Sequence, residues 1–141
     1  MDSESRAPIQ DALTRPLWDL RVSVIDRCNF RCGYCMPTDA LKFHADFLPR
    51  KRLLSDAEID RLVRAFVDLG IAKIRITGGE PLLRPGLVSL IKRLAGIAGV
   101  EDLALISNGF MIAGHCDHWQ VNMQEKLRVV TSLRTAQVKL V

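Results

Sequence analysis

The sequence has no long uninterrupted run of apolar residues. A membrane-spanning helix needs at least about 18 of them, so no such helix and no membrane partner are expected in these 141 residues. Internal repeats and low-complexity tracts are also missing, and the first residues do not resemble a secretory signal. We therefore expect a cytoplasmic protein in a reducing compartment, where disulfides are rare.

Neither sign of charge dominates the composition. Lys and Arg number 20 against 16 Asp and Glu, which gives a net charge of +4. This excess suits an anionic ligand but is too small to indicate a nucleic-acid partner. The hydrophobic content of 48% with 26% charged residues is that of a globular protein, and the length suits one domain with a core of its own.

Three of the four cysteines stand close together, at Cys28, Cys32 and Cys35. Their C-x3-C-x2-C spacing follows an apolar, β-branched run at 20–25, so three thiolates can converge on one soft metal centre such as an iron–sulfur cluster. A four-iron cluster held by three cysteines has one iron without a protein ligand. Catalytic metal sites need such an open position, whereas structural sites are closed.

Structural zinc and inert thiols are the alternatives for these cysteines. Zinc sites usually show a second pair of ligands at a fixed distance from the first. The later candidates are His115, Cys116 and His118, and they fall within a predicted helix. A surface histidine and a buried cysteine are the better interpretation of that group.

The apolar pattern predicts strands and helices in alternation. Period-two spacing indicates strands and helical spacing indicates helices. Ser55 and Glu58 form a capping box that begins one helix, and Gly70 ends it. This order predicts an α/β fold with a parallel sheet and right-handed crossovers. The predicted strands cover 17–25, 71–77 and 103–106, and the predicted helices cover 55–70, 86–96 and about 110 into the 120s.

Three short motifs each follow a predicted strand. They are Cys28–Cys35, then Gly78-Gly79-Glu80-Pro81, then Ser107-Asn108-Gly109. The carboxyl ends of parallel strands meet at one edge of a sheet, where the sites of α/β proteins gather. Paired glycines also let a backbone approach a ligand closely, although a plain Gly-Pro turn is the alternative.

Basic residues alternate along two neighbouring predicted strands, at Arg21, Lys73 and Arg75. Strands of a parallel sheet normally direct apolar side chains to both faces, and burying unpartnered charges is costly. A triphosphate would supply the opposite charge, because Arg binds phosphate oxygens in a bidentate fork. Exposure of these side chains to solvent at the strand ends is the alternative.

The cysteine spacing, with an aromatic residue before the last cysteine, resembles the signature of radical S-adenosylmethionine (SAM) enzymes. The wider text LRVSVIDRCNFRCGYCMP at 20–37, together with the Gly-Gly-Glu-Pro motif, resembles the GTP 3′,8-cyclases of molybdenum cofactor biosynthesis. The resemblance runs from about residue 18 to 115. It implies that an iron–sulfur cluster is bound by Cys28, Cys32 and Cys35, and that SAM is bound by Tyr34 and Gly79. GTP would be bound by Arg21, Arg75 and Ser107, with Lys73 a weaker case.

The resemblance also implies a fold, a partial (βα)6 TIM-like barrel of which this chain holds the first three βα units, at 17–118. A flexible arm at 1–16 would precede them, and a divergent tail at 119–141 would follow, which we do not place on the family pattern. The family's second cluster lies nearer the C-terminus, and Cys116 is the only cysteine beyond Cys35. We therefore expect that this chain alone does not complete the cyclisation of GTP that the resemblance implies.

The implied reaction is that of a lyase using a [4Fe–4S] cluster and SAM. An electron from a low-potential donor cleaves SAM, and the 5′-deoxyadenosyl radical removes the C3′ hydrogen of GTP to give 3′,8-cyclo-7,8-dihydro-GTP. A radical SAM enzyme with another substrate and a non-enzymatic metal-binding module are the alternatives. An unpaired edge on the third strand should make the isolated chain associate, for instance as a homodimer.

Overall fold

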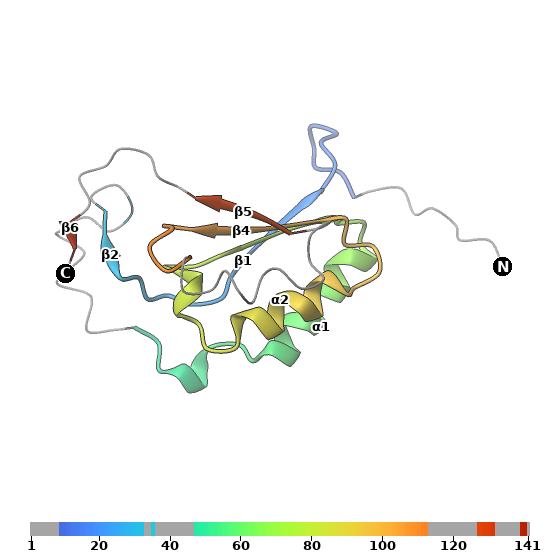
Figure 1. Ribbon diagram of the computed structural model, residues 1–141. Coiled ribbons are helices and arrows are strands. Elements are labelled where there is room, and N and C mark those ends of the chain that lie inside the picture. The colour runs from blue at the N-terminus through green and yellow to red at the C-terminus, as the bar shows by residue number, and fades with distance from the viewer. Residues whose placement is uncertain (1–8, 33–34, 36–46, 113–126, 132–138, 141) are drawn as a thin grey trace.

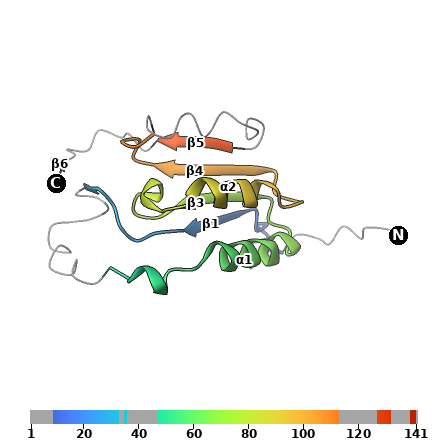
Figure 2. The ribbon, with the colours of Figure 1, turned by 60° about the horizontal axis from the view of Figure 1, so that its bottom comes forward.

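The computed structural model describes residues 9–32, 35, 47–112, 127–131 and 139–140. Its centre is a four-stranded parallel sheet, and helices α1 and α2 lie together on one face of it (Figures 1 and 2). The predicted α/β class with a parallel sheet is confirmed. In spatial order the strands are β1 (Asp19–Ser23), β3 (Lys73–Thr77), β4 (Asp102–Ser107) and β5 (Leu127–Thr131); the helices are α1 (Asp56–Asp68) and α2 (Leu87–Ala95).

Strands β1, β3 and β4 are the three that the apolar pattern predicts, with slightly different bounds. Strand β5 was not predicted, since it lies in the tail that the sequence did not place. It pairs in parallel with β4, Leu127 opposite Leu103 and Thr131 opposite Ser107. Its sequence, Leu-Arg-Val-Val-Thr, does not alternate cleanly between apolar and polar residues, so its pairing with β4 reveals it better than its sequence does.

The two helices begin and end where their sequences predict. At the start of α1, Ser55 Oγ accepts a hydrogen bond from the Glu58 amide at 3.3 Å, and Glu58 Oε2 accepts one from the Ser55 amide at 2.7 Å. Gly70 follows the helix with a φ of 99°, a conformation that glycine adopts without steric cost. The third predicted helix is not seen at its start, because residues 110–112 form a turn; its remainder lies outside the described residues.

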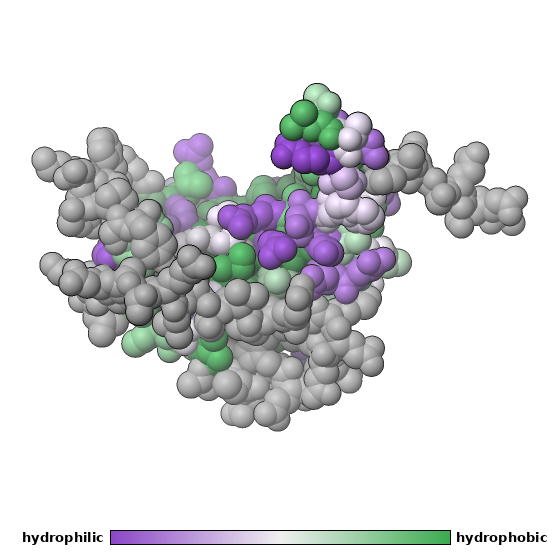
Figure 3. Space-filling model, turned by 90° about the horizontal axis from the view of Figure 1, so that it is seen from above, coloured by the Kyte–Doolittle hydropathy of each residue, from purple (hydrophilic) through white to green (hydrophobic). Residues whose placement is uncertain are grey.

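The strands present two different faces. Alternation places Ile74, Ile76, Leu103 and Leu105 in the core with the apolar side of α2, and all four are almost fully buried. No described helix covers the opposite face, where hydrophilic side chains gather when the molecule is viewed from above (Figure 3). The sheet is therefore half-covered in the part of the chain that the structure describes.

Smaller elements complete the described chain. Strand β2 (Phe30–Arg31) pairs antiparallel with β6 (Lys139–Leu140), and short 3₁₀ helices lie at η2 (Arg50–Arg52) and η3 (Pro81–Leu83). The arm expected at 1–16 folds back on itself in its described part, since the Leu17 amide donates to the Ile9 carbonyl at 2.8 Å. Within the described ranges, no helix has both the length and the apolar character that crossing a bilayer requires.

Candidate functional site

The cysteine segment and the Gly-Gly-Glu-Pro loop are joined through their backbones at the carboxyl ends of β1 and β3. The Val24 amide donates to the Thr77 carbonyl at 2.9 Å, and the Gly79 amide donates to the Ile25 carbonyl at 2.8 Å. One step further on, the Glu80 amide donates to the Arg27 carbonyl, also at 2.8 Å. The structure therefore brings together the first two predicted motifs.

Glycine is required in this loop because another backbone occupies the space of a side chain. A Cβ atom at Gly79 would lie 2.1 Å from the Arg27 carbonyl oxygen, and one at Gly78 would lie 2.4 Å from that of Ile25. Both distances are far shorter than any van der Waals contact. The glycines thus allow the start of the cysteine segment to lie against the end of β3. This is a structural reason for the two glycines, in addition to the predicted contact of Gly79 with SAM.

Glu80 ties this loop to the third motif. Its carboxylate is completely buried and accepts hydrogen bonds from Ser107 Oγ at 2.9 Å, the Asn108 amide at 2.8 Å and the Leu82 amide at 3.0 Å. Buried carboxylates need such donors to offset their lost hydration. All three predicted motifs therefore meet at one edge of the sheet.

Ser107 itself is only 2% exposed, and its hydroxyl proton is directed at Glu80. Its strand position places it on the same face as Leu103 and Leu105, whereas Ala104, the register partner of Arg75, lies on the other face. Ser107 is therefore not brought together with Arg21 and Arg75. Its contact with GTP stays a prediction.

The three cysteines differ in their surroundings. Cys32 is buried, Cys28 is half-buried and Cys35 is exposed. Cys28 Sγ accepts the Phe30 amide at 3.4 Å and the Asn108 side-chain amide at 3.8 Å. The Cys35 amide donates to the Cys32 carbonyl at 3.1 Å, which closes a turn between the second and third cysteines.

The donor set fits a soft, positively charged metal centre. Partial desolvation raises the pKa of the Cys35 thiol even though its side chain is largely exposed, and the nearby sulfurs of Cys32 and Cys28 raise it further, because a negative charge on either one disfavours a second nearby. A bound iron–sulfur centre would relieve that repulsion, since thiolates are its usual ligands. The fit is one of chemistry and not of position: among the described residues, which include all three cysteines, no three His, Cys, Asp or Glu side chains surround a single ion position. Tyr34, His115, Cys116 and His118 lie outside those residues.

The basic side chains on the uncovered face are exposed or half-buried, which was the alternative to their burial against an anion. Arg21 and Arg75 are direct register partners on β1 and β3, and Arg21 and Lys73 are exposed. Arg75 pairs with Asp19, with 3.3 Å between Nε and Oδ1, and the two side chains keep 38% and 48% exposure. Two guanidinium groups on neighbouring strands repel each other unless an anion lies between them.

Sequence reasoning missed two residues of this site. Asn108 was recognised only as part of a strand-end motif, although its side chain reaches Cys28. The side chain of Arg84 is 10% exposed; its Nη1 donates to the Val24 carbonyl and its Nη2 to Asp56 Oδ1, each at 2.7 Å. Arg84 thereby holds the end of β1 against the start of α1. Its position after the Gly-Gly-Glu-Pro loop gives no sequence signal for this role.

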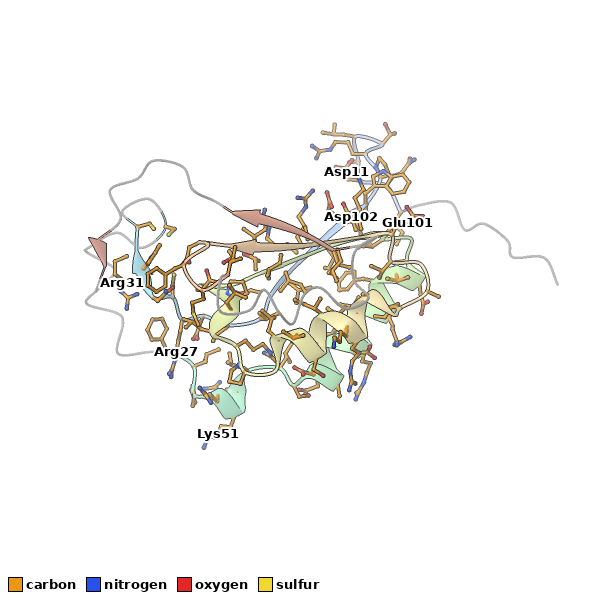
Figure 4. All side chains as sticks on the ribbon, viewed as in Figure 1. Asp11, Arg27, Arg31, Lys51, Glu101 and Asp102 are labelled. Atoms are coloured by element: carbon orange, nitrogen blue, oxygen red, sulfur yellow. The ribbon has the colours of Figure 1, made fainter. Side chains whose placement is uncertain are left out.

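A cavity of about 630 Å³ lies beside the cysteine segment. Ile25, Leu53 and Leu83 contribute apolar walls, and Arg27 and Lys51 contribute positive charge. Both of these basic residues lie at the end of the molecule where the strands finish (Figure 4). Since Arg27 directly precedes Cys28, the cavity adjoins the cysteine segment.

Comparison with known proteins identifies a family for this fold and site. Residues 22–133 match the radical SAM superfamily. The chain is 57% identical over 107 residues to a GTP 3′,8-cyclase of Xanthomonas axonopodis pv. citri, with 76% of this chain and 32% of that protein covered. It is 54% identical over 106 residues to the Acidothermus cellulolyticus GTP 3′,8-cyclase, with 75% and 29% covered. The Staphylococcus epidermidis enzyme of that name is 50% identical over 107 residues, with 76% and 32% covered. The chain thus spans about a third of the length of these relatives.

Proposed function

Because the chain belongs to the radical SAM superfamily, we propose that it is the N-terminal part of a GTP 3′,8-cyclase, a lyase that converts GTP to 3′,8-cyclo-7,8-dihydro-GTP in molybdenum cofactor biosynthesis. The similarity to enzymes of that name, at 50–57% identity, supports the substrate and reaction. Since the chain spans 32% of the Xanthomonas relative, the complete reaction belongs to the whole protein. The sheet is then the opening part of a partial (βα)6 barrel, with further strands following β5.

The observation that carries this proposal is the joining of the cysteine segment to the Gly-Gly-Glu-Pro loop. Membership of the superfamily implies a [4Fe–4S] cluster and SAM, which when bound supply a one-electron cleavage that yields a 5′-deoxyadenosyl radical. Cys28, Cys32 and Cys35 would hold the cluster. Gly79 lies beside the backbone of Arg27, one residue before the first of these ligands, so a molecule bound at this loop is close to them.

The uncovered face of the sheet is the proposed place for the GTP triphosphate. Arg21 and Arg75 stand side by side there in parallel register, with Lys73 on the same face. An anion between the two guanidinium groups would offset their mutual repulsion and receive bidentate hydrogen bonds.

Further components belong to the whole protein. An external low-potential donor would supply the electron. The edge of the third strand, β4, is not unpaired as expected, because β5 pairs with it in parallel. Self-association of the isolated chain, for instance as a homodimer, would therefore use the outer edge of β5 instead. The arm at 1–16, the core at 17–118 and the divergent tail at 119–141 stay the proposed division of the chain, with β5 now inside the last of these segments.

Anaerobic reconstitution with iron and sulfide tests the proposal. The chain should gain a broad absorbance at about 400 nm, with iron and sulfide in equal amounts. Cys32→Ala should lose the absorbance, the iron and the sulfide. Cys116→Ala is the matched control, because it removes a cysteine outside the predicted trio. A colourless protein that binds zinc would instead support a structural metal module.

The substrate is tested separately. In the full-length protein, formation of 5′-deoxyadenosine should depend on GTP and should not be supported by ATP. Equal formation with both nucleotides, or with a peptide substrate in place of GTP, would favour a radical SAM enzyme of another specificity.

A further inference from the structure

We propose that Asn108 is a positioning residue for the iron–sulfur cluster, whose side-chain N–H donates to Cys28 Sγ and raises the reduction potential of the cluster. The inference rests on the proposed function, because it takes Cys28 to be a cluster ligand. Asn108 Nδ2 lies 3.8 Å from Cys28 Sγ and 2.9 Å from Asn29 Oδ1. One amide group thus reaches the first cysteine and its neighbour from the end of β4.

The direction of this amide is fixed by a third contact. The backbone amide of Phe110 lies 3.0 Å from the side-chain oxygen of Asn108. A backbone N–H can only donate, so the atom that faces it must be the oxygen of the Asn108 side chain. The nitrogen therefore faces Cys28 and Asn29, and the contact with sulfur is an N–H···S hydrogen bond rather than a contact between two acceptors.

The backbone of Asn108 is held as firmly as its side chain. Its amide donates to Glu80 Oε2 at 2.8 Å, and the preceding residue, Ser107, donates its hydroxyl to Oε1 of the same buried carboxylate. A displacement of Asn108 would break the bond from its amide and disturb the one from Ser107, which would leave the Leu82 amide as the remaining described donor to the buried Glu80. The amide is consequently preorganised to face the first cysteine before any metal binds.

The sulfur of Cys28 receives a second donor, the Phe30 amide at 3.4 Å. Two N–H dipoles therefore point at one sulfur. Hydrogen bonds to cluster sulfurs set the reduction potential, because they stabilise negative charge and the reduced cluster carries one more negative charge than the oxidised one. Asn108 should accordingly favour the reduced form of a cluster held by Cys28.

The test is a redox titration of the anaerobically reconstituted chain, followed by visible absorbance and by electron paramagnetic resonance. Asn108→Ala removes the N–H donor, and we expect a lower midpoint potential at an unchanged content of iron and sulfide. Asn108→Asp keeps the shape and the oxygen that accepts from Phe110 but replaces the donor with a charged acceptor, so the potential should fall further. The order of midpoint potentials should be wild type, then Asn108→Ala, then Asn108→Asp.

Asn29→Ala is the matched control, because it removes the other acceptor of the same amide and leaves the bond to sulfur in place. Its potential should equal that of the wild type. If Asn108→Ala does not load a cluster, the isosteric Asn108→Asp decides the question. Loaded Asn108 variants with the wild-type potential would overturn the proposal, since a purely structural residue alters loading or stability alone. A wild-type chain that takes up neither iron nor sulfide would instead refute the proposed function and remove the basis of this inference.

Discussion

The hydroxyl of Ser107 donates a hydrogen bond to the buried carboxylate of Glu80, with 2.9 Å between Oγ and Oε1. This bond joins the end of β4 to the loop that follows β3. The carboxylate is completely buried, and its described hydrogen-bond partners are Ser107, Asn108 and Leu82. Glu80 therefore organises two of the three loops of the candidate site, whatever contact it makes with a cofactor.

Replacement of Glu80 should destabilise the fold strongly. In Glu80→Gln one side-chain oxygen becomes an N–H₂ group, which faces the Asn108 amide, so two donors meet in a buried position. Hydrogen bonds to charged groups contribute about 1.5–3 kcal/mol each, so a loss of roughly 3 kcal/mol in the free energy of unfolding is expected. Urea denaturation followed by circular dichroism measures it, with the exposed Glu101→Gln as control. Equal midpoints for the two variants would contradict this role of Glu80.

Gly79→Ala should detach the cysteine segment from the Gly-Gly-Glu-Pro loop. The new Cβ atom would lie 2.1 Å from the Arg27 carbonyl oxygen, so one of the two backbones must move. Overpacking of this kind costs about 1–3 kcal/mol, and iron uptake should fall with it. Gly96→Ala is the matched control, because its nearest atoms would lie at an ordinary 3.5 Å. Iron content and urea midpoint should both separate the two variants; a loaded and stable Gly79→Ala would disprove the steric argument.

The sequence predicted well those features that local chemistry decides. The capping box at Ser55, the end of α1 before Gly70 and three of the sheet strands depend on short-range patterns. Strand β5 depends on its neighbour β4, and the sequence gives no measure of that pairing. For Arg21 the sequence left burial against an anion and exposure to solvent both open, because the outcome depends on which residues cover the second face of the sheet.

The candidate site shows the same division. The cysteine spacing and the paired glycines could be recognised in the sequence, because metal binding by thiols and close backbone approach at glycines depend on the residue types alone. Asn108 gains its role from a contact with Cys28 across 80 positions of sequence, which only the fold creates. Ser107 has a hydroxyl suited to phosphate, yet the fold directs it at Glu80.

The capping box should give the chain a pH-dependent stability. Hydrogen bonds from the Ser55 amide and hydroxyl lower the pKa of Glu58 below its ordinary value of 4.5. A lowered pKa in the folded state adds stability above the unfolded value, and that stability disappears as the pH falls through the folded value. Glu58→Gln should therefore unfold more easily than the wild type at pH 7, with the difference closing well below pH 4.5. Thermal denaturation of both proteins over this pH range measures the difference in stability. A difference that does not depend on pH would contradict a lowered pKa of Glu58 in the folded state.

Arg21→Gln and Arg75→Gln should each weaken the binding of GTP about tenfold, the effect of losing roughly 1.4 kcal/mol of charge-assisted hydrogen bonding. Unfolding free energy should change little, because Arg75 pairs with Asp19 only at an exposed position. Titration with a fluorescent GTP analogue measures the affinity. Arg93→Gln, in the last turn of α2, is the control on the far side of the sheet. Equal loss of affinity in all three variants would point to general electrostatic attraction rather than a defined triphosphate site.

The contact between Cys28 and Asn108 bears on when a cluster in a newly made chain reaches its final reduction potential. The cysteine segment leaves the ribosome 80 residues ahead of its asparagine partner. Until β4 and the residues after it have emerged and docked, the first thiol lacks its hydrogen bond from Asn108, and Glu80 lacks those from Ser107 and Asn108. On the proposed role of Asn108, a cluster that entered the chain before this contact formed would have a lower reduction potential, which would rise to its final value only once the third strand of the sheet is in place.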